Sequence, residues 1–493
     1  MNTNDYFKQL LRKKRKSVNT LISETNTSKS TIYRVMHGLQ QPSLELEAKI
    51  IEVLSLDPTE AQQLRYYLSA TEVDEGLLSA RGEVSHLLFR QSKPDVEPIE
   101  LVYYDGEQYV RTFDYVLQAL LSKSGQDNFA CTIRLVNCNQ DRIIIPLSAA
   151  ISTLNTRGAN YTVEHLVNFS THDYKENIHT LTHLIPLLAF NRYSVRYRET
   201  SKVSNHGFFH NLLILEYEYL SNTSETIKKQ LYLSFLPNNL SSCYVVNGEH
   251  MRDFFARNYL SLAQEYQLSL NNKDPLEDYA MLFLMYEMNH DLYLFKPSIC
   301  YNRVPTSIWE NVMQRFNPEN FLREFLQEKF NPALLETHVR ELLLFMETRN
   351  KASYLHKQVD IMTMAGLTAF AHTGLLLDHF ADLPAFTKEE VKEILQRILQ
   401  RDLNPEDPYR FHVLKEEYNS DTLTIIAASN RGLVIEYAVQ KRPAHVLPYC
   451  IIEHKETSNV FIDFADNYIP NFLAFPQEEA HAFVESLIRQ LDS

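Results

Sequence analysis

Residues Ser17 to Gly38 read Ser-Val-Asn-Thr-Leu-Ile-Ser-Glu-Thr-Asn-Thr-Ser-Lys-Ser-Thr-Ile-Tyr-Arg-Val-Met-His-Gly, and this stretch sets the architecture of the N-terminal region. Ser17 and Ser28 can each cap a helix, because a serine hydroxyl accepts hydrogen bonds from the N–H groups of the first turn. Asn26 lies between the two and tolerates the left-handed backbone that a tight turn requires. The stretch therefore predicts two short helices joined by a tight turn.

The second of these helices, predicted over 29–37, has two different sides. At about 100° per residue, three apolar side chains fall together on one side and small or cationic side chains fall on the other. The apolar set is Ile32, Val35 and Met36, and the polar set is Ser30, Tyr33, Arg34 and His37, with Lys29 and Thr31 at its edges. A short helix with such an outer face, preceded by another capped helix, is suited to insertion into a DNA major groove.

Further helices are predicted on both sides of this pair. One spans 5–14, another follows Pro42-Ser43 to about residue 56, and a third starts at 57–60. Together these residues resemble the Cro/lambda-repressor-type (XRE) helix-turn-helix family over roughly 65 of the 493 residues. The resemblance is carried by Ser28, Ser30, Thr31, Ile32, Arg34, Gly38 and Pro42-Ser43-Leu44. Two features depart from the family pattern, namely Val18 in place of an early Gln, and Asn26 in place of the turn Gly, between Thr25 and Thr27.

The resemblance implies which side chains would meet DNA. Those expected at base edges are Lys29, Ser30, Thr31, Tyr33 and Arg34, with Arg34 suited to a bidentate pair with guanine. Those expected at phosphates are Arg12, Lys13, Lys14, Lys16, Ser28, His37 and Gln40. A small helical bundle that uses the same motif for protein contacts is the alternative.

The charge distribution also favours DNA binding by the N-terminal region. Residues 1–70 hold ten Lys and Arg against seven Asp and Glu, a net charge of +3, whereas the other 423 residues hold 38 against 55, a net charge of −17. An acidic body repels nucleic acid, so we expect any DNA contact to come from the basic N-terminal end.

Composition restricts the class of protein further. The chain is 44% hydrophobic and 22% charged, which excludes a disordered or fibrous protein. Its five Cys are scattered and odd in number, so reduced thiols are expected rather than disulfides. The sequence has no long apolar stretch and no signal-peptide pattern. We therefore expect a soluble cytoplasmic protein without a membrane partner.

The larger part of the chain has a different periodicity. Helices are predicted over 109–122, 146–154, 175–190, 249–266 and 476–491, and residues 276–400 are predicted to be mostly helical. Strands are predicted over 101–105, 129–136, 161–169, 193–197, 212–219, 230–236, 242–246, 410–414, 423–428, 432–439, 449–453 and 459–464. Strands that follow one another without helices indicate hairpins, so the sheets should be mixed. The fold class is thus multidomain, with an all-α helix-turn-helix bundle followed by a large α/β body and a helical middle segment.

The predicted organisation has five parts. They are a DNA-binding domain (1–70), a helical connector or linker (71–98), an α/β sensor subdomain (99–272), a helical segment (273–400) and a C-terminal α/β subdomain (401–493). A helix, four or five strands and a second helix occur in this order at 174–266 and again at 386–491, which suggests two pseudo-repeated subdomains. A dimer contact is predicted at 59–90, since helices between a DNA-binding domain and a larger domain often form the interface between two subunits.

The sequence of the body contains few motifs that indicate an active site or a binding site. Phosphate-binding glycine loops, a GxSxG elbow and CxxC pairs do not occur in the sequence. His179 and His183 could share a metal, but core histidines are the more probable interpretation. His412, Lys415 and Asp421 faintly resemble the phospholipase-D-like pattern, but their spacing is wrong and we reject them as an active site. We expect no enzyme, no catalytic residue, no metal and no cofactor.

These observations favour a sequence-specific DNA-binding transcriptional regulator. Its large C-terminal region would bind an effector, which could be a small molecule, a peptide or a protein, and would hold a homodimer on double-stranded operator DNA. Two alternatives remain. One is a peptide-pheromone-responsive regulator, whose body would be tandem helical repeats. The other is a DNA-tethered enzyme with an unrecognised active site.

Overall fold

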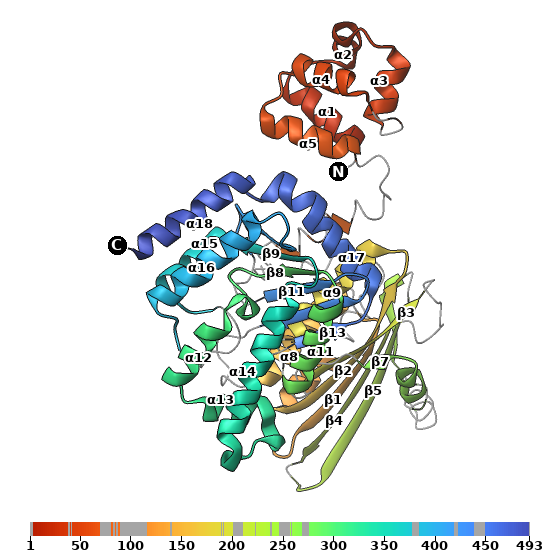
Figure 1. Ribbon diagram of the computed structural model, residues 1–493. Coiled ribbons are helices and arrows are strands. Elements are labelled where there is room, and N and C mark those ends of the chain that lie inside the picture. The colour runs from red at the N-terminus through yellow and green to blue at the C-terminus, as the bar shows by residue number, and fades with distance from the viewer. Residues whose placement is uncertain are drawn as a thin grey trace.

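The computed structural model describes residues 3–37, 40, 42–69, 80–81, 84, 87–88, 116–138, 141–188, 190, 192–200, 211–221, 223–236, 239–245, 257, 259–268, 276–376, 384–418, 423–437 and 449–492. Within these residues it has an N-terminal helical bundle and a large body with two mixed sheets (Figure 1). The predicted fold class is therefore confirmed. The strand predicted over 101–105 and the start of the helix predicted over 109–122 lie outside the described residues, and residues 116–123 are helical.

The bundle consists of five helices: α1 (Thr3–Lys13), α2 (Val18–Thr25), α3 (Lys29–Met36), α4 (Leu44–Val53) and α5 (Pro58–Ser69). One apolar core joins them and includes Phe7 of α1, Leu21 of α2, Val35 of α3, Ile50 of α4 and Leu64 of α5, all at most 1% exposed. Buried apolar residues are spaced three or four apart within a helix, as Phe7, Leu10 and Leu11 are in α1, so burial of one stripe per helix assembles the bundle.

The first sheet of the body has the strand order β6-β5-β4-β1-β2-β3-β7. Its strands are β1 (Ala130–Val136), β2 (Asn160–Ser170), β3 (Tyr193–Thr200), β4 (Leu212–Leu220), β5 (Thr226–Leu236), β6 (Asn239–Val245) and β7 (Gln267–Leu268). β1, β2 and β3 are parallel and are connected by α8 (Asp141–Thr156) and α9 (Tyr174–Leu188). β4 then pairs antiparallel with β1, β5 with β4, and β6 with β5.

The second sheet has the order β10-β9-β8-β11-β12-β13. Its strands are β8 (Leu292–Phe295), β9 (Gln358–Thr363), β10 (Tyr409–Leu414), β11 (Leu423–Ala428), β12 (Gly432–Tyr437) and β13 (Tyr449–Ile452). Its helices are α11 (Leu276–Asn289), α12 (Thr306–Arg315), α13 (Pro318–Leu326), α14 (Leu335–Ala352), α15 (Met364–Thr373), α16 (Lys388–Leu403), α17 (Lys455–Asp463) and α18 (Gln477–Leu491). A ten-residue π-helix, η6 (Phe464–Leu473), continues directly from α17.

The two sheets repeat one topology. In each, three parallel strands joined by helical crossovers are followed by three antiparallel strands, so that β8 to β13 correspond in order and direction to β1 to β6. The predicted pseudo-repeat is therefore present, but its unit is larger than predicted. It begins before β1 and before β8, whereas the predicted units began at 174 and 386.

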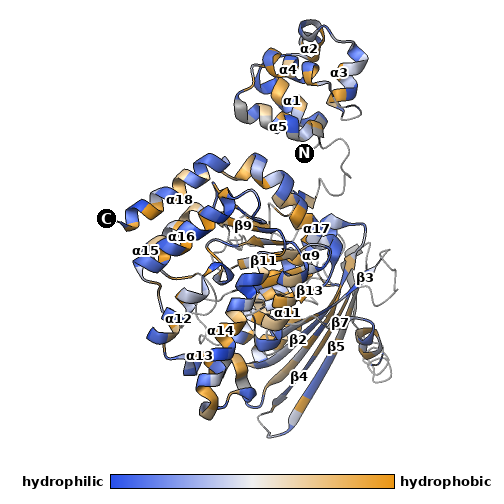
Figure 2. Ribbon diagram, in the orientation of Figure 1, coloured by the Kyte–Doolittle hydropathy of each residue, from blue (hydrophilic) through white to orange (hydrophobic). Residues whose placement is uncertain are grey.

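A shared apolar core joins the two repeats. It contains Ile133 of β1, Leu184 of α9, Phe295 of β8, Ile425 of β11 and Phe461 of α17, all at most 1% exposed. α9 contacts both β2 and β12, and α17 contacts α9, β11 and β12, so these helices lie between the sheets. A separate core covers the opposite face of the second sheet with α11 to α16 and α18. Figure 2 shows hydrophobic residues gathered around β11 and β13, whereas α16 and α18 alternate between hydrophobic and hydrophilic residues.

The structure corrects two predictions. β8 and β9 lie within the segment predicted as helical, 273–400, and pair with β11 and β10, so the predicted boundary at 400 falls inside one sheet. Residues 459–464, predicted as a strand, belong to α17 and η6, because a short apolar run does not distinguish a strand from a buried helix. The dimer contact predicted at 59–90 stays a prediction; among the described residues of this range, the buried apolar ones pack within the chain.

Two buried ion pairs fix the crossover of the second repeat. The Arg303 guanidinium donates to both Asp360 oxygens at 2.8 and 2.7 Å, and that of Arg349 donates to both Glu287 oxygens at 2.7 and 2.9 Å. Each of the four side chains is at most 4% exposed. Because buried charges are tolerated only when paired and hydrogen-bonded, these contacts constrain how α11, α14 and β9 pack.

We predict that Glu287→Gln destabilises the second repeat by about 3–5 kcal/mol, because it leaves the Arg349 charge buried without its partner. The fluorescence of Trp309, the only Trp of the chain, reports unfolding in urea, since this side chain is buried in the core of that repeat. The double variant Glu287→Gln/Arg349→Met should recover much of the loss. If Glu287→Gln leaves the urea midpoint unchanged, this pair does not constrain the fold.

Candidate nucleic-acid interface

The turn between α2 and α3 forms as the sequence predicts. The Ser17 hydroxyl accepts a hydrogen bond from the Thr20 N–H at 3.1 Å, and the Ser28 hydroxyl accepts one from the Thr31 N–H at 3.2 Å. Asn26 has a φ of 52° and a ψ of 42°, which is the left-handed conformation, so an asparagine fills the turn position. The buried Thr25 hydroxyl donates to the Leu21 carbonyl at 2.6 Å, which satisfies the polar group within this core.

α3 divides into the two faces expected. Ile32, Val35 and Met36 are buried in the bundle core. All five side chains predicted at base edges belong to this helix, and four of them are exposed, with Thr31 half-buried: Lys29, Ser30, Thr31, Tyr33 and Arg34. The structure therefore brings the predicted base-contact set together on one outer face.

Contacts within this face organise several of its side chains. The Tyr33 ring, 39% exposed, has the Lys29 ammonium 5.8 Å from its centroid, and the His37 ring stacks with it at 6.4 Å. At the start of the helix, the Ser28 hydroxyl lies 2.9 Å from the Ser30 hydroxyl and 2.8 Å from that of Thr31. The helix thus presents a row of hydroxyls at its N-terminus and a cationic, aromatic surface further along.

The residues predicted at phosphates fall into two groups. Arg12, Ser28, His37 and Gln40 are exposed. The three lysines of the basic run form ion pairs: Lys13 and Lys14 with Glu60 at 2.8 and 2.5 Å, and Lys16 with Glu24 at 3.3 Å. These lysines would have to share or leave their carboxylate partners in order to reach a phosphate.

Glu60 joins the end of α1 to the start of α5. It belongs to a reciprocal cap in which the Asp57 N–H donates to Glu60 Oε2 at 3.0 Å and the Glu60 N–H donates to Asp57 Oδ1 at 2.8 Å. The Tyr6 hydroxyl donates to the Glu60 carbonyl at 3.3 Å. Hydrogen bonds from Lys13 and Lys14 lower the pKa of the Glu60 carboxyl to about 2. Sequence reasoning missed this role for the two lysines, because Glu60 is over 40 residues away in the chain.

We predict that Glu60→Gln destabilises the bundle by about 1 kcal/mol at pH 7, because one partner of each ion pair is lost. Since the pKa of Glu60 is lowered by folding, the stabilisation exists above the ordinary carboxyl pKa and disappears as the pH falls from about 4.5 toward 2. Hydrogen exchange of residues 3–69 measures it. Glu45→Gln, which removes the exposed pair with Lys49, is the matched control. Equal differences at pH 7 and pH 2 would contradict the assignment.

The bundle contacts the body on the side opposite to α2 and α3. α5 faces the body and contacts η6, while α2 and α3 lie at the far end of the bundle (Figure 1). The Tyr67 ring meets the Phe472 ring edge-on at 6.0 Å, and Phe472 stacks on Tyr468 at 4.6 Å. Arg81 forms a bidentate ion pair with Asp463, one contact being 2.6 Å. These contacts leave α3 uncovered by the described part of the body.

The remaining chemical candidates stay separate from this surface. His179 and His183 have their Nε2 atoms 3.3 Å apart on α9, and no third ligand group joins them among the described residues. His412 lies on β10, and Asp421 lies outside the described residues. Cys131, Cys138, Cys300 and Cys450 are buried free thiols. None of the described helices is long and apolar enough to cross a membrane.

Comparisons with known proteins identify no relative. No protein-family model matches the sequence, and no curated protein is significantly similar to it. A functional assignment therefore depends on the geometry and charge of the bundle.

Proposed function

We propose that the protein is a sequence-specific DNA-binding transcriptional regulator. In this proposal residues 3–69 act as an XRE-type helix-turn-helix unit, and the acidic body controls when and in what geometry the unit binds. The observation that carries the proposal is α3, a capped eight-residue helix after a tight left-handed turn, whose exposed face combines hydroxyls, a tyrosine and two cations.

The chemistry of this face fits the edges of base pairs. A guanidinium such as that of Arg34 can donate two hydrogen bonds to guanine O6 and N7, and the Thr31 methyl or the Tyr33 ring can contact a thymine methyl. Serine and threonine hydroxyls at the N-terminus of α3 can donate to phosphates or bases, where the helix dipole also favours negative charge. Arg12, His37 and Gln40 would contact the flanking phosphates.

Two observations on the body favour a sensing role over a catalytic role or a peptide-pheromone receptor. The constellations typical of phosphate-binding loops and of nucleophile elbows do not occur in the sequence. Its two mixed sheets differ from the tandem helical repeats expected of a peptide-pheromone-responsive regulator. We propose that the body binds an effector and that a cytoplasmic homodimer places two α3 helices in successive major grooves, about 34–36 Å apart.

We predict that Arg34→Ala weakens binding to the preferred DNA by about 1–3 kcal/mol and relaxes the sequence preference, because a bidentate base contact is lost. DNA fragments retained by the purified chain would first be sequenced, and the best one used in a gel-retardation titration. Arg65→Ala is the matched control, since Arg65 lies on α5 and pairs with Glu47 at 2.7 Å. Unchanged affinity and preference in Arg34→Ala would exclude α3 as the reading helix.

We predict a different effect for Arg12→Ala. Loss of a phosphate contact should weaken binding to all DNA sequences similarly and reduce the slope of log affinity against log salt by about 1. Titrations between low and moderate salt with specific and random duplexes measure both quantities. Lys228→Ala in the body, where Lys228 is 75% exposed, is the control. A loss confined to the specific duplex would show that Arg12 contacts a base instead.

A further inference from the structure

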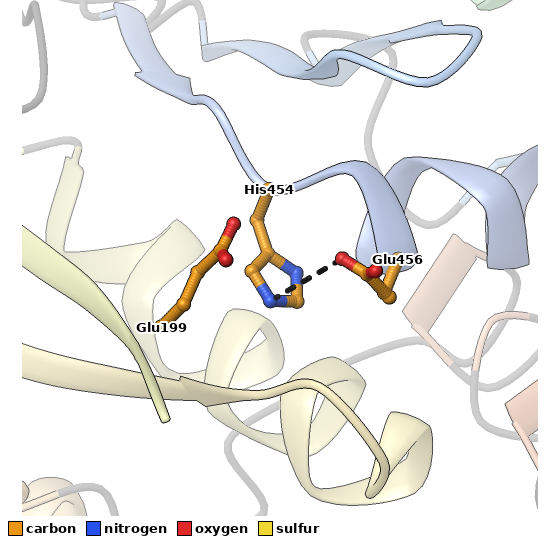
Figure 3. Close-up of side chains that lie close together, drawn as sticks. All are labelled: Glu199, His454 and Glu456. Atoms are coloured by element: carbon orange, nitrogen blue, oxygen red, sulfur yellow. Dashed lines mark ion pairs between the residues drawn. The ribbon is translucent and has the colours of Figure 1, made fainter. Parts of the chain in front are cut away.

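Three ligand-bearing side chains meet where the two repeats join. Glu199 lies near the C-terminal end of β3 in the first repeat, and His454 and Glu456 lie at the start of α17 in the second. One ligand atom from each lies within 4.8 Å of the others. The Glu199 and Glu456 carboxylates stand on opposite sides of the His454 imidazole (Figure 3).

The His454 side chain is fully buried, yet its Nε2 atom has no hydrogen-bond partner. Glu456 Oε2, which forms the ion pair drawn in Figure 3, lies 3.9 Å from Nε2 and is itself a buried atom without a hydrogen-bond partner. Lys455 pairs with the other oxygen of Glu456, Oε1, at 3.6 Å. Two unsatisfied buried polar atoms that face each other indicate a missing ligand, since such atoms are rarely left unpaired in folded proteins.

The opposite ring nitrogen is suited to orient the imidazole. His454 Nδ1 lies 2.7 Å from the Thr457 hydroxyl and accepts a hydrogen bond from the Thr457 N–H at 3.2 Å, which caps α17. Binding of a cation at Nε2 requires the tautomer in which Nδ1–H donates to the Thr457 hydroxyl, as in metal sites whose histidine is fixed by a second hydrogen bond. Metal binding would therefore replace the capping hydrogen bond from the Thr457 N–H with this one.

We propose that Glu199, His454 and Glu456 bind one divalent transition-metal cation, such as Zn²⁺ or Mn²⁺. One imidazole nitrogen and two carboxylate oxygens are ligands that both metals accept, with water in the remaining position. Ligand bonds of about 2.0–2.2 Å require the three atoms to move closer together. The exposed Glu199 side chain can rotate to do so.

The position of the site gives it a route to the DNA-binding bundle. His454 caps α17, this helix continues directly into η6, and η6 contacts α5. A cation that ties Glu199 to the start of α17 would fix this helix relative to the first repeat. The metal would then be the effector that controls DNA binding. The metal site itself is independent of the proposed function, whereas this effector role rests on the proposed function.

Calorimetric titration of the full chain with Zn²⁺, and Mn²⁺ titration followed by electron paramagnetic resonance, test the site. We expect one equivalent of metal to bind. Glu199→Gln and His454→Asn should weaken this binding at least tenfold, and asparagine retains the ability to cap α17. Glu225→Gln, at an exposed turn position, is the control. Unchanged Trp309 fluorescence shows that each variant is folded.

The outcomes separate the two levels of the inference. Absence of metal binding, or binding that Glu199→Gln and His454→Asn leave unchanged, overturns the site. If metal binds but DNA retardation is the same with Zn²⁺ and with a chelator, the effector role is wrong and the site stands. If the chain retards no DNA under either condition, the proposed function fails while the calorimetric result is unaffected.

Discussion

The second mixed sheet is buried on both faces, whereas most strands of the first alternate buried with partly exposed residues, and the need to cover these apolar faces governs the architecture of the body. Each sheet carries its crossover helices on one face. The two repeats bury further apolar surface in a shared core that contains α9 and α17. Because apolar area removed from water contributes about 25 cal/mol per Å², a shared core stabilises both sheets at once. The repeats are therefore mutually dependent, and the helices between them are the elements through which one can affect the other.

The π-helix η6, which continues α17, connects the body to the bundle. An aromatic series runs from Phe295 in the shared core through Phe464, Tyr468 and Phe472 to Tyr67 of the bundle. Most of it lies on η6, and π-helices are rare and frequently occur at functional sites. Since the bundle rests on this segment by α5, its outward helix, α3, is held away from the body. In the proposed function, an acidic body can then carry a basic DNA-binding bundle without covering α3.

The bundle could be predicted from the sequence because its helix caps and its turn depend on local interactions. The prediction of the body was less accurate because it depends on pairing between residues far apart in the chain. Ser17, Asn26 and Ser28 act through hydrogen bonds or backbone preferences within a few residues, so the turn between α2 and α3 could be placed. β8 and β9 were missed, because each is short and fully buried, and the four residues of β8 are all apolar. The partners of Lys13 and Lys14, and the meeting of Glu199 with His454, depend on residues far apart in the chain. No local pattern encodes them.

The central claim is that α3 reads DNA while the body stays off it. Hydrogen exchange of the full chain, measured with and without a DNA fragment that it retains, tests this claim most directly. The account predicts slower exchange in residues 17–37 when DNA is bound, with no protection in the two sheets of the body. Protection confined to the sheets, with α2 and α3 exchanging as in the free protein, would contradict it.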